Sequence, residues 1–221
     1  MTEGYTADAV GSWNRLVLAL LQGRDEFSTL LRRHRAEFRK HGLEGLPVEA
    51  FVAAAQGRVD DARQVLNGPE RESWRHAVAV IQHKAAGFCA PFVAAFGDHD
   101  HIVALYDYLT DHSGTWLVQY TNHYVGAADH HLGVLARALG RPDEAEDRLG
   151  AALASYDAAP ERLFRAAALV ELAELAAERD DMQGCRDLLA MAEPEARQMG
   201  LQPLLARCAD LQIALVARHG K

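Results

Sequence analysis

Cysteine is scarce in this chain, and its spacing excludes two common structural uses of the residue. The three cysteines, Cys89, Cys185 and Cys208, lie far apart and form no Cys-x-x-Cys pair. An odd number of isolated cysteines indicates neither a disulfide framework nor a zinc ribbon. The pattern is typical of reduced thiols in the cytoplasm, and we expect no metal centre built on cysteine.

Excess positive charge and long apolar runs are also lacking. The formal net charge is −8, which argues against general nucleic-acid binding, because such binding depends on Lys and Arg releasing counterions from phosphates. No run of about 18 apolar residues suggests a membrane span, and residues 1–10 lack the basic and apolar regions of an export signal. We therefore expect a cytoplasmic protein that binds neither nucleic acid nor membrane.

Motifs of common enzyme classes are missing as well. The chain contains no G-x-S-x-G nucleophile turn and no G-x-x-x-x-G-K-[ST] phosphate loop. We find no strand pattern in the sequence and predict an all-α chain. These absences favour a non-catalytic protein without a cofactor, although they leave the question of an enzyme open.

The clearest positive signal is the stretch 127–160, which predicts a helix, a tight turn and a second helix. Apolar residues recur at helical spacing in both halves: Leu132, Leu135, Ala136 and Leu139, then Ala145, Leu149, Ala152, Leu153 and Tyr156. Gly140 stands where a left-handed residue would end the first helix, and Pro142 suits the first turn of the second. The stretch thus predicts two antiparallel helices.

This stretch resembles a tetratricopeptide repeat (TPR), whose Leu-Gly, turn Gly and Ala positions match Leu132-Gly133, Gly140 and Ala145. Similar spacings predict four repeats at 47–68, 73–110, 117–160 and 161–200, with N-terminal helices at 1–46 and a capping helix at 201–221. Before the third repeat we expect a loop at 111–114, and the repeat then begins with a long helix that runs into His130. In the fourth, Asp180 replaces the turn glycine. The resemblance implies a right-handed superhelix of antiparallel helix pairs.

At larger scale, residues 25–215 resemble the C-terminal helical repeats of the large ATP-binding transcriptional regulators of the LuxR and adenylate-cyclase-associated kind. The segments that carry this resemblance are AFVAAAQGRVDDARQVL, FVAAFGDHDHIVALYDYL, HHLGVLARALGRPDEAEDRLGAALA and LVELAELAAERDDMQGCRDLLAMAEPEARQMGL. In those proteins such repeats sense a ligand or a partner. The ATP-binding and DNA-reading motifs of the family are missing from this sequence, so the resemblance implies a sensor or adaptor surface.

The resemblance also implies that the first helix of each pair lines a concave groove. Transferring that geometry gives nine candidate binding residues: Lys84, Gly87, Pro91, Tyr120, His123, His130, Arg137, Glu174 and Glu178. Pro91 has a physical signal of its own, because a proline inside a helix leaves the carbonyl four residues earlier, that of Gly87, without its intrahelical partner. The kink could open a pocket, or it could be structural only.

The segment 98–131 is rich in histidine and aspartate, which are metal ligands and acid–base groups. On a continuous helix, however, His123 and His130 would lie about 10 Å apart, too far to bind one ion. His131 is adjacent to the core residue Leu132 and could be a packed, hydrogen-bonded side chain. A metal or catalytic site and a structural role remain alternatives for this segment.

We predict a non-catalytic, TPR-like interaction or ligand-sensing module that binds a peptide, a partner protein or a small molecule in its groove. The alternative is an enzyme, or a small-molecule or metal-binding protein, that uses a histidine-rich pocket. An enclosed apolar cavity with converging polar groups would favour the alternative, and an open groove would favour the interaction module. The apolar helix bearing Trp13, Leu16 and Leu20 could also support a homodimer.

Overall fold

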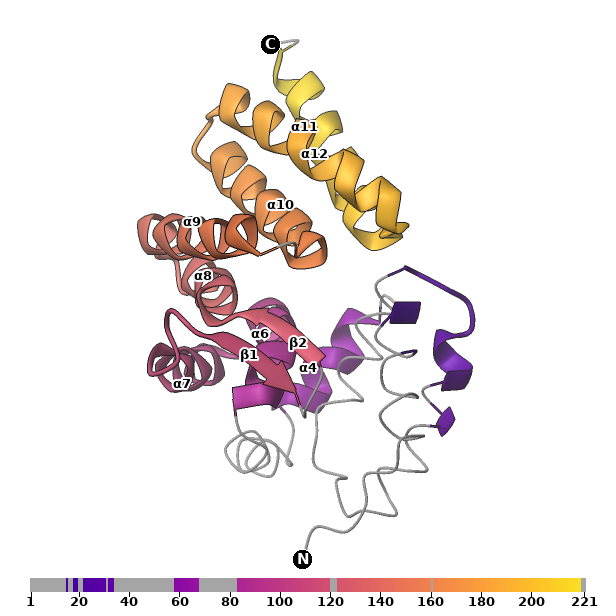
Figure 1. The fold of residues 1–221 in the computed structure, drawn as a ribbon, viewed down its shortest axis with the longest axis vertical. Helices are drawn as coiled ribbons and strands as arrows, with labels where there is room; N and C mark the ends of the chain where they lie inside the picture. The colour runs from indigo at the N-terminus through magenta and orange to yellow at the C-terminus, as the bar shows by residue number, and fades with distance from the viewer. Residues whose placement is uncertain are drawn as a thin grey trace, which may run out of the picture.

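The structure is a computed structural model that describes residues 15, 18–19, 22–30, 32–33, 58–67, 83–119, 123–159 and 161–219. These residues are mostly helical (Figure 1), as the sequence predicts. The helices are α4 (Val59–Asn67), α6 (His83–Phe96), α7 (His99–Thr110), α8 (Ala128–Ala138), α9 (Pro142–Ala158), α10 (Arg162–Glu178), α11 (Met182–Met199) and α12 (Gln202–His219), and the strands are β1 (Trp116–Gln119) and β2 (His123–Ala127). In this part of the chain, no helix combines the length and the apolar character that crossing a bilayer requires.

Helices that follow one another in the sequence pack against one another in space. α6 contacts α7 and α8, and the packing continues from α8 to α9, α10, α11 and α12. Figure 1 shows this order as a progression from the magenta helices to the yellow C-terminal helix. Short connections between neighbouring helices explain the arrangement, because a tight turn forces two amphipathic helices to bury their apolar faces against each other.

The predicted pair of helices at 127–160 is present as α8 and α9. Gly140 has φ 71°, and Pro142 occupies the first turn of α9. The two helices approach closely at Gly133, where a Cβ atom would lie 2.6 Å from Cγ of Leu149. Glycine is needed at this position because any side chain would push α8 and α9 apart.

The next pair, α10 and α11, repeats this construction forty residues later. Asp180, which replaces the turn glycine, has φ 60° and is the one non-glycine residue of positive φ in the described chain. Aspartate tolerates this conformation better than most residues do. The equivalent core positions Cys185, Leu189 and Ala192 are at most 2% exposed. The turn positions predicted at Gly140 and Asp180 are therefore confirmed, as is the burial of Leu132, Leu135, Ala136, Ala145, Leu149, Ala152 and Tyr156.

The residues before α8 form a β-hairpin, and here the prediction was wrong. β1 and β2 pair antiparallel between Trp116 and Ala127, where we expected a helix to run from 117 into His130. The segment WLVQYTNHYVGA is rich in β-branched and aromatic residues, which favour strands. The described chain is thus mostly helical with one β-hairpin, and α8 begins only at Ala128.

A β-bulge shapes the second strand. The pairing steps from Leu117–Gly126 to Val118–Tyr124, so Val125 is the extra residue. Gly126 has φ 99°, and a Cβ there would lie 3.0 Å from Oη of Tyr156. The hairpin therefore lies directly against α9, and only glycine allows this approach.

Residues 22–30 lie against the C-terminal helices although they come from the other end of the chain. Nε2 of Gln22 donates to the carbonyl of Met199 at 2.9 Å, and Gly23 is next to Gln202 and Pro203. Phe27 is buried. Trp13, Leu16 and Leu20, which we proposed for self-association, lie outside the described residues.

Candidate functional site

A cavity of about 740 Å³ lies between four helices, residue 19 and the segment 23–28. α6, α8, α10 and α12 each contribute to its wall; the first three are the first helices of successive pairs, and α12 follows the last pair. The larger apolar side chains that line it include Phe27, Phe92, Phe96, Val134, Leu163, Phe164 and Leu204. A cavity of this size and character is typical of sites for small organic molecules.

His130 is the first polar group in the cavity wall. It projects from the first turn of α8 and is 5% exposed. Its Nδ1 lies 3.1 Å from Oη of Tyr156, and the same oxygen accepts a hydrogen bond from the N–H of Ala127 at 2.9 Å. Tyr156 therefore joins the cavity histidine to the end of β2.

His131 is the second polar group, and the bulge of β2 holds it. Its Nε2 donates to the carbonyl of Val125 at 2.6 Å. Its Nδ1 is sealed from solvent, and no described residue hydrogen-bonds to it. The imidazole is consequently neutral, with its proton on Nε2.

Burial keeps both histidines uncharged near neutral pH. It lowers the pKa of His131 to about 4, although the hydrogen bond to Val125 raises it in part. Burial also lowers the pKa of His130 well below its usual value, and the neighbouring His131 and the charge of Arg207 lower it further. A base with a pKa of about 4 is weak at pH 7, so His131 is poorly matched to general-base catalysis.

A network of five charged residues forms another part of the wall. Arg137 of α8 and Arg207 of α12 converge on three carboxylates of α10, those of Glu171, Glu174 and Glu178. Arg207 lies 2.6 Å from Glu171 and 2.8 Å from Glu174, whereas Arg137 pairs with all three, at 3.2 Å from Glu171. We call these residues the ion-pair network. Glu171 and Arg207 belong both to this network and to the cavity lining.

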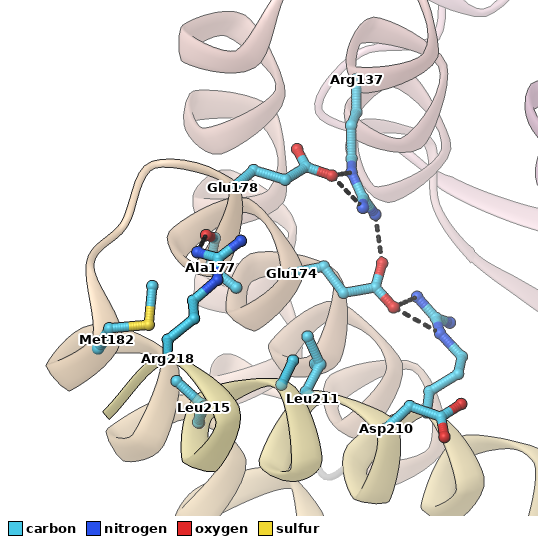
Figure 2. Close-up of a pocket in the computed structure, with 11 residues that line it drawn as sticks. Arg137, Glu174, Ala177, Glu178, Met182, Asp210, Leu211, Leu215 and Arg218 are labelled. Carbon is cyan, nitrogen blue, oxygen red and sulfur yellow. Dashed lines mark hydrogen bonds and ion pairs between the residues drawn. The ribbon is translucent and has the colours of Figure 1, made fainter. Parts of the chain in front are cut away.

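On the far side of the network lies a second hollow of about 370 Å³. Figure 2 shows Arg137 and Glu178 at its upper edge and Leu211 and Leu215 of α12 on the opposite wall. Arg218 donates to the carbonyl of Ala177 at 3.0 Å and pairs with Asp180 at 2.5 Å. Every arginine in this hollow has an acidic partner within the chain, so we call it the charged hollow.

The positive and negative charges within the ion-pair network compensate one another. Burial alone would raise the pKa of Glu174, but hydrogen bonds and charge from Arg207 and Arg137 outweigh burial and lower the pKa. Burial acts to lower the pKa of Arg207, and the charges of Glu171 and Glu174 raise it above its usual value. The network therefore stays ionised and offers no uncompensated cation to a ligand.

The structure divides the predicted binding residues into two groups. Pro91 and His130 line the cavity, whereas Arg137, Glu174 and Glu178 line the charged hollow. Gly87 and Pro91 are both within α6, as predicted.

One predicted residue contradicts the expected arrangement, and two others have side chains outside the described residues. His123 lies in β2 and not on the helix of His130, so the two do not share a helical stripe. Its side chain and that of Lys84 fall outside the described part of the structure, as does all of Tyr120.

Sequence reasoning missed most of the cavity lining. Phe92 and Phe96 are spaced i, i+4 on α6, a signal that we could have used. Glu171 follows His131 by forty residues, so the repeat register relates them. Phe27 and Arg207 had no such signal, because only the tertiary fold brings residues 23–28 to the first turns of α12.

The described side chains of the histidine-rich segment do not converge into a metal site. Asp98 caps α7 by accepting from the N–H of His101, and Asp129 accepts from Ser113, Gly114 and Arg148. Across the ranges that the structure describes, no group of three His, Cys, Asp or Glu side chains could hold a metal ion. These aspartates are therefore structural.

Comparisons of the chain with protein-family models, with curated proteins and with solved structures find no match. The resemblance to the helical repeats of large regulators stays a prediction, and the function has to be argued from the cavity.

Proposed function

We propose that this chain is a non-catalytic, ligand-sensing regulatory module that binds a small organic molecule in the cavity between α6, α8, α10, α12, residue 19 and residues 23–28. We further propose that the helix pairs form a TPR-like right-handed superhelix whose concave side contains this cavity. The observation that carries the proposal is the cavity itself: about 740 Å³, lined mainly by aromatic and aliphatic side chains, with His130 among them. The resemblance to sensor repeats suggests the regulatory role and the cytoplasmic location.

The position of residues 23–28 favours a small molecule over a peptide. A peptide or a partner helix needs a groove that is open along its length. Here Gly23 and Phe27 lie over the helices that would line such a groove. The remaining space is within the range of sites that enclose most of a small ligand.

Catalysis is less well supported than binding. The two histidines are neutral, and Tyr156 and Val125 each occupy one of their ring nitrogens. Arg137, which an enzyme could use to bind an anion, is paired with Glu171, Glu174 and Glu178. The polar groups around the cavity therefore orient and satisfy one another, as expected for a binding site without a reactive nucleophile.

The test is binding of the uncharged fluorescent dye N-phenyl-1-naphthylamine, whose emission increases in apolar surroundings. We expect saturable binding of one dye per chain. Ala167 of α10 lines the cavity, and the substitution Ala167→Phe would occupy part of it and weaken dye binding.

Ala154→Phe is the matched control, because Ala154 is an exposed residue of α9 that is not part of the cavity lining. This variant should bind the dye like the wild type. If the wild type gives no saturable signal, or if Ala167→Phe binds normally, small-molecule binding in this cavity is wrong.

A further inference from the structure

The hydrogen bonds around Tyr156 determine which nitrogen of His130 carries the proton. Tyr156 is 1% exposed, so its hydroxyl hydrogen needs a buried acceptor. The hydroxyl oxygen already accepts from the N–H of Ala127, and Nδ1 of His130 lies 3.1 Å away. The hydroxyl therefore donates to Nδ1, and the neutral imidazole has its hydrogen on Nε2.

This Nε2–H group is a hydrogen-bond donor at the cavity wall. His130 lines the cavity and is 5% exposed, and its hydrogen bond through Nδ1 is the one it makes within the described chain. Its Nε2 is not among the buried polar atoms that are sealed from solvent without a partner, whereas Nδ1 of His131 is. A donor in an apolar wall gains most from an acceptor that brings little water with it.

The charges in the lining cancel. Arg24 and Arg207 are balanced by Asp25 and Glu171, and Arg207 is paired directly with Glu171 at 2.6 Å. The aromatic side chains occupy most of the remaining wall. An anion would lose its hydration without gaining an unpaired arginine, because Arg207 is paired with Glu171 and Arg24 with Glu26, and the Nε2–H donor of His130 offers nothing to a cation, so the surroundings favour an uncharged molecule.

We infer that the cavity selects an uncharged, largely apolar molecule that carries one hydrogen-bond acceptor, a carbonyl group, which accepts from Nε2 of His130. The inference rests on the proposed function and specifies its ligand class. Tyr156 is a positioning residue in this arrangement, because it sets the tautomer of His130 and does not itself line the cavity.

The experiment compares three naphthalenes of similar size as competitors of N-phenyl-1-naphthylamine. 2-Acetylnaphthalene has a carbonyl, 2-ethylnaphthalene replaces it with a methylene, and 2-naphthoate adds a negative charge. One neutral hydrogen bond should make the ketone bind about fivefold more tightly than the ethyl compound. The naphthoate should bind more weakly than the ketone.

Two variants of His130 test the donor. His130→Leu removes Nε2–H, and the ketone should lose its advantage over the ethyl compound. His130→Gln retains an N–H at a similar distance from the backbone and should restore part of that advantage. Tyr156→Phe leaves the tautomer unfixed and should reduce the advantage without removing binding of the ethyl compound.

A spectroscopic readout separates direct contact from a structural effect. Isotope-edited infrared spectroscopy of 2-acetylnaphthalene labelled with ¹³C at the carbonyl should show a lower stretching frequency in the wild-type complex than in an apolar solvent. The shift should disappear in His130→Leu. It remains measurable in the wild type even if that variant does not fold.

The outcomes distinguish the inference from the function on which it rests. If all three compounds and the dye fail to bind, the proposed function is wrong. If the ketone and the ethyl compound bind equally, or if the naphthoate binds best, the inference is overturned while small-molecule binding stands. A carbonyl band that is unshifted in the wild-type complex would overturn it as well.

Discussion

The two helix pairs α8–α9 and α10–α11 have similar residues at equivalent core positions, and they differ in the residues that face the cavity. Gly133, Ala145 and Leu149 in the first pair correspond to Ala173, Cys185 and Leu189 in the second, forty residues later. All six positions are buried. Small residues at the first two positions let the helices approach closely, and this requirement is the same in both pairs.

At the cavity the same register carries different chemistry. His131 and Glu171 occupy equivalent positions and both line the cavity, yet one is neutral and the other is paired with Arg207 and Arg137. The repeated positions therefore build the fold, and the positions that change between pairs build the site. The predictions below compare equivalent or matched positions of the two pairs.

The largest expected effect is a loss of stability in mild acid that comes from His131. Its pKa is about 4 in the folded chain, against about 6.5 when unfolded. Between these values the unfolded chain binds a proton that the folded chain does not, so the free energy of unfolding falls as pH falls. The full difference is about 3 kcal/mol, complete near pH 4. Urea denaturation between pH 7.5 and 4.5 measures it.

His131→Gln is the control for this prediction. Glutamine can donate to the carbonyl of Val125 but does not titrate, so the variant should lose much less stability than the wild type over the same pH range. The remaining acid sensitivity would then report His130, whose pKa is also lowered. Equal pH dependence of the wild type and the variant would show that His131 is not a buried neutral group.

The second prediction concerns Glu171, the equivalent position in the other pair. Glu171→Leu leaves Arg137 and Arg207 with one carboxylate fewer each, in a place where the side chain of Glu171 is 12% exposed. We expect a loss of about 2 kcal/mol in the free energy of unfolding, because a partly buried cation loses a partner. Chemical denaturation at pH 7.5 measures it.

Glu178→Gln provides the comparison within the same ion-pair network. The side chain of Glu178 is 52% exposed, and exposed ion pairs contribute less than about 1 kcal/mol. A loss for Glu178→Gln as large as that for Glu171→Leu would contradict the view that burial, and not the number of ion pairs, makes the network important.

The third prediction tests the close contact between α8 and α9. In Gly133→Ala the new methyl group would lie 2.6 Å from Cγ of Leu149, so the helices must shift. The strain exceeds the gain in helix propensity, and we expect a net loss of about 1–2 kcal/mol. Gly150→Ala is the control, because nothing lies near a Cβ atom at Gly150 of α9. It should raise the melting temperature.

The difference between the repeated core positions and the cavity positions also explains how much of this structure the sequence predicts. The turn at Gly140, the helix start at Pro142 and the buried positions of α8 to α12 follow from local rules and helical periodicity. Such features depend on neighbours in the sequence, so a single chain is enough to find them. The cavity cannot be found in this way, because Phe27 and Arg207 meet only through tertiary packing.

The β-hairpin was missed for a different reason. The signal was present: Val118, Tyr124 and Val125 belong to two short runs of residues with high strand propensity. Extending the repeat pattern backwards from Leu132 imposed a helix on these residues. Because of this mistake, we placed His123 on a helix and not in β2. We also did not foresee that the carbonyl of Val125 accepts a hydrogen bond from His131. A repeat template therefore predicts equivalent positions well and predicts insertions between repeats poorly.

The smallest expected effect compares the equivalent turn positions Gly140 and Asp180, which both have positive φ. Gly140→Ala should cost about 1 kcal/mol from backbone strain alone, because nothing else lies near a Cβ there. Asp180→Gly should gain about 0.5 kcal/mol, since the exposed pair with Arg218 contributes little. Thermal unfolding of the two variants checks both signs. If Asp180→Gly is destabilising, the aspartate has a role beyond ending α10, and the second turn is not equivalent to the first.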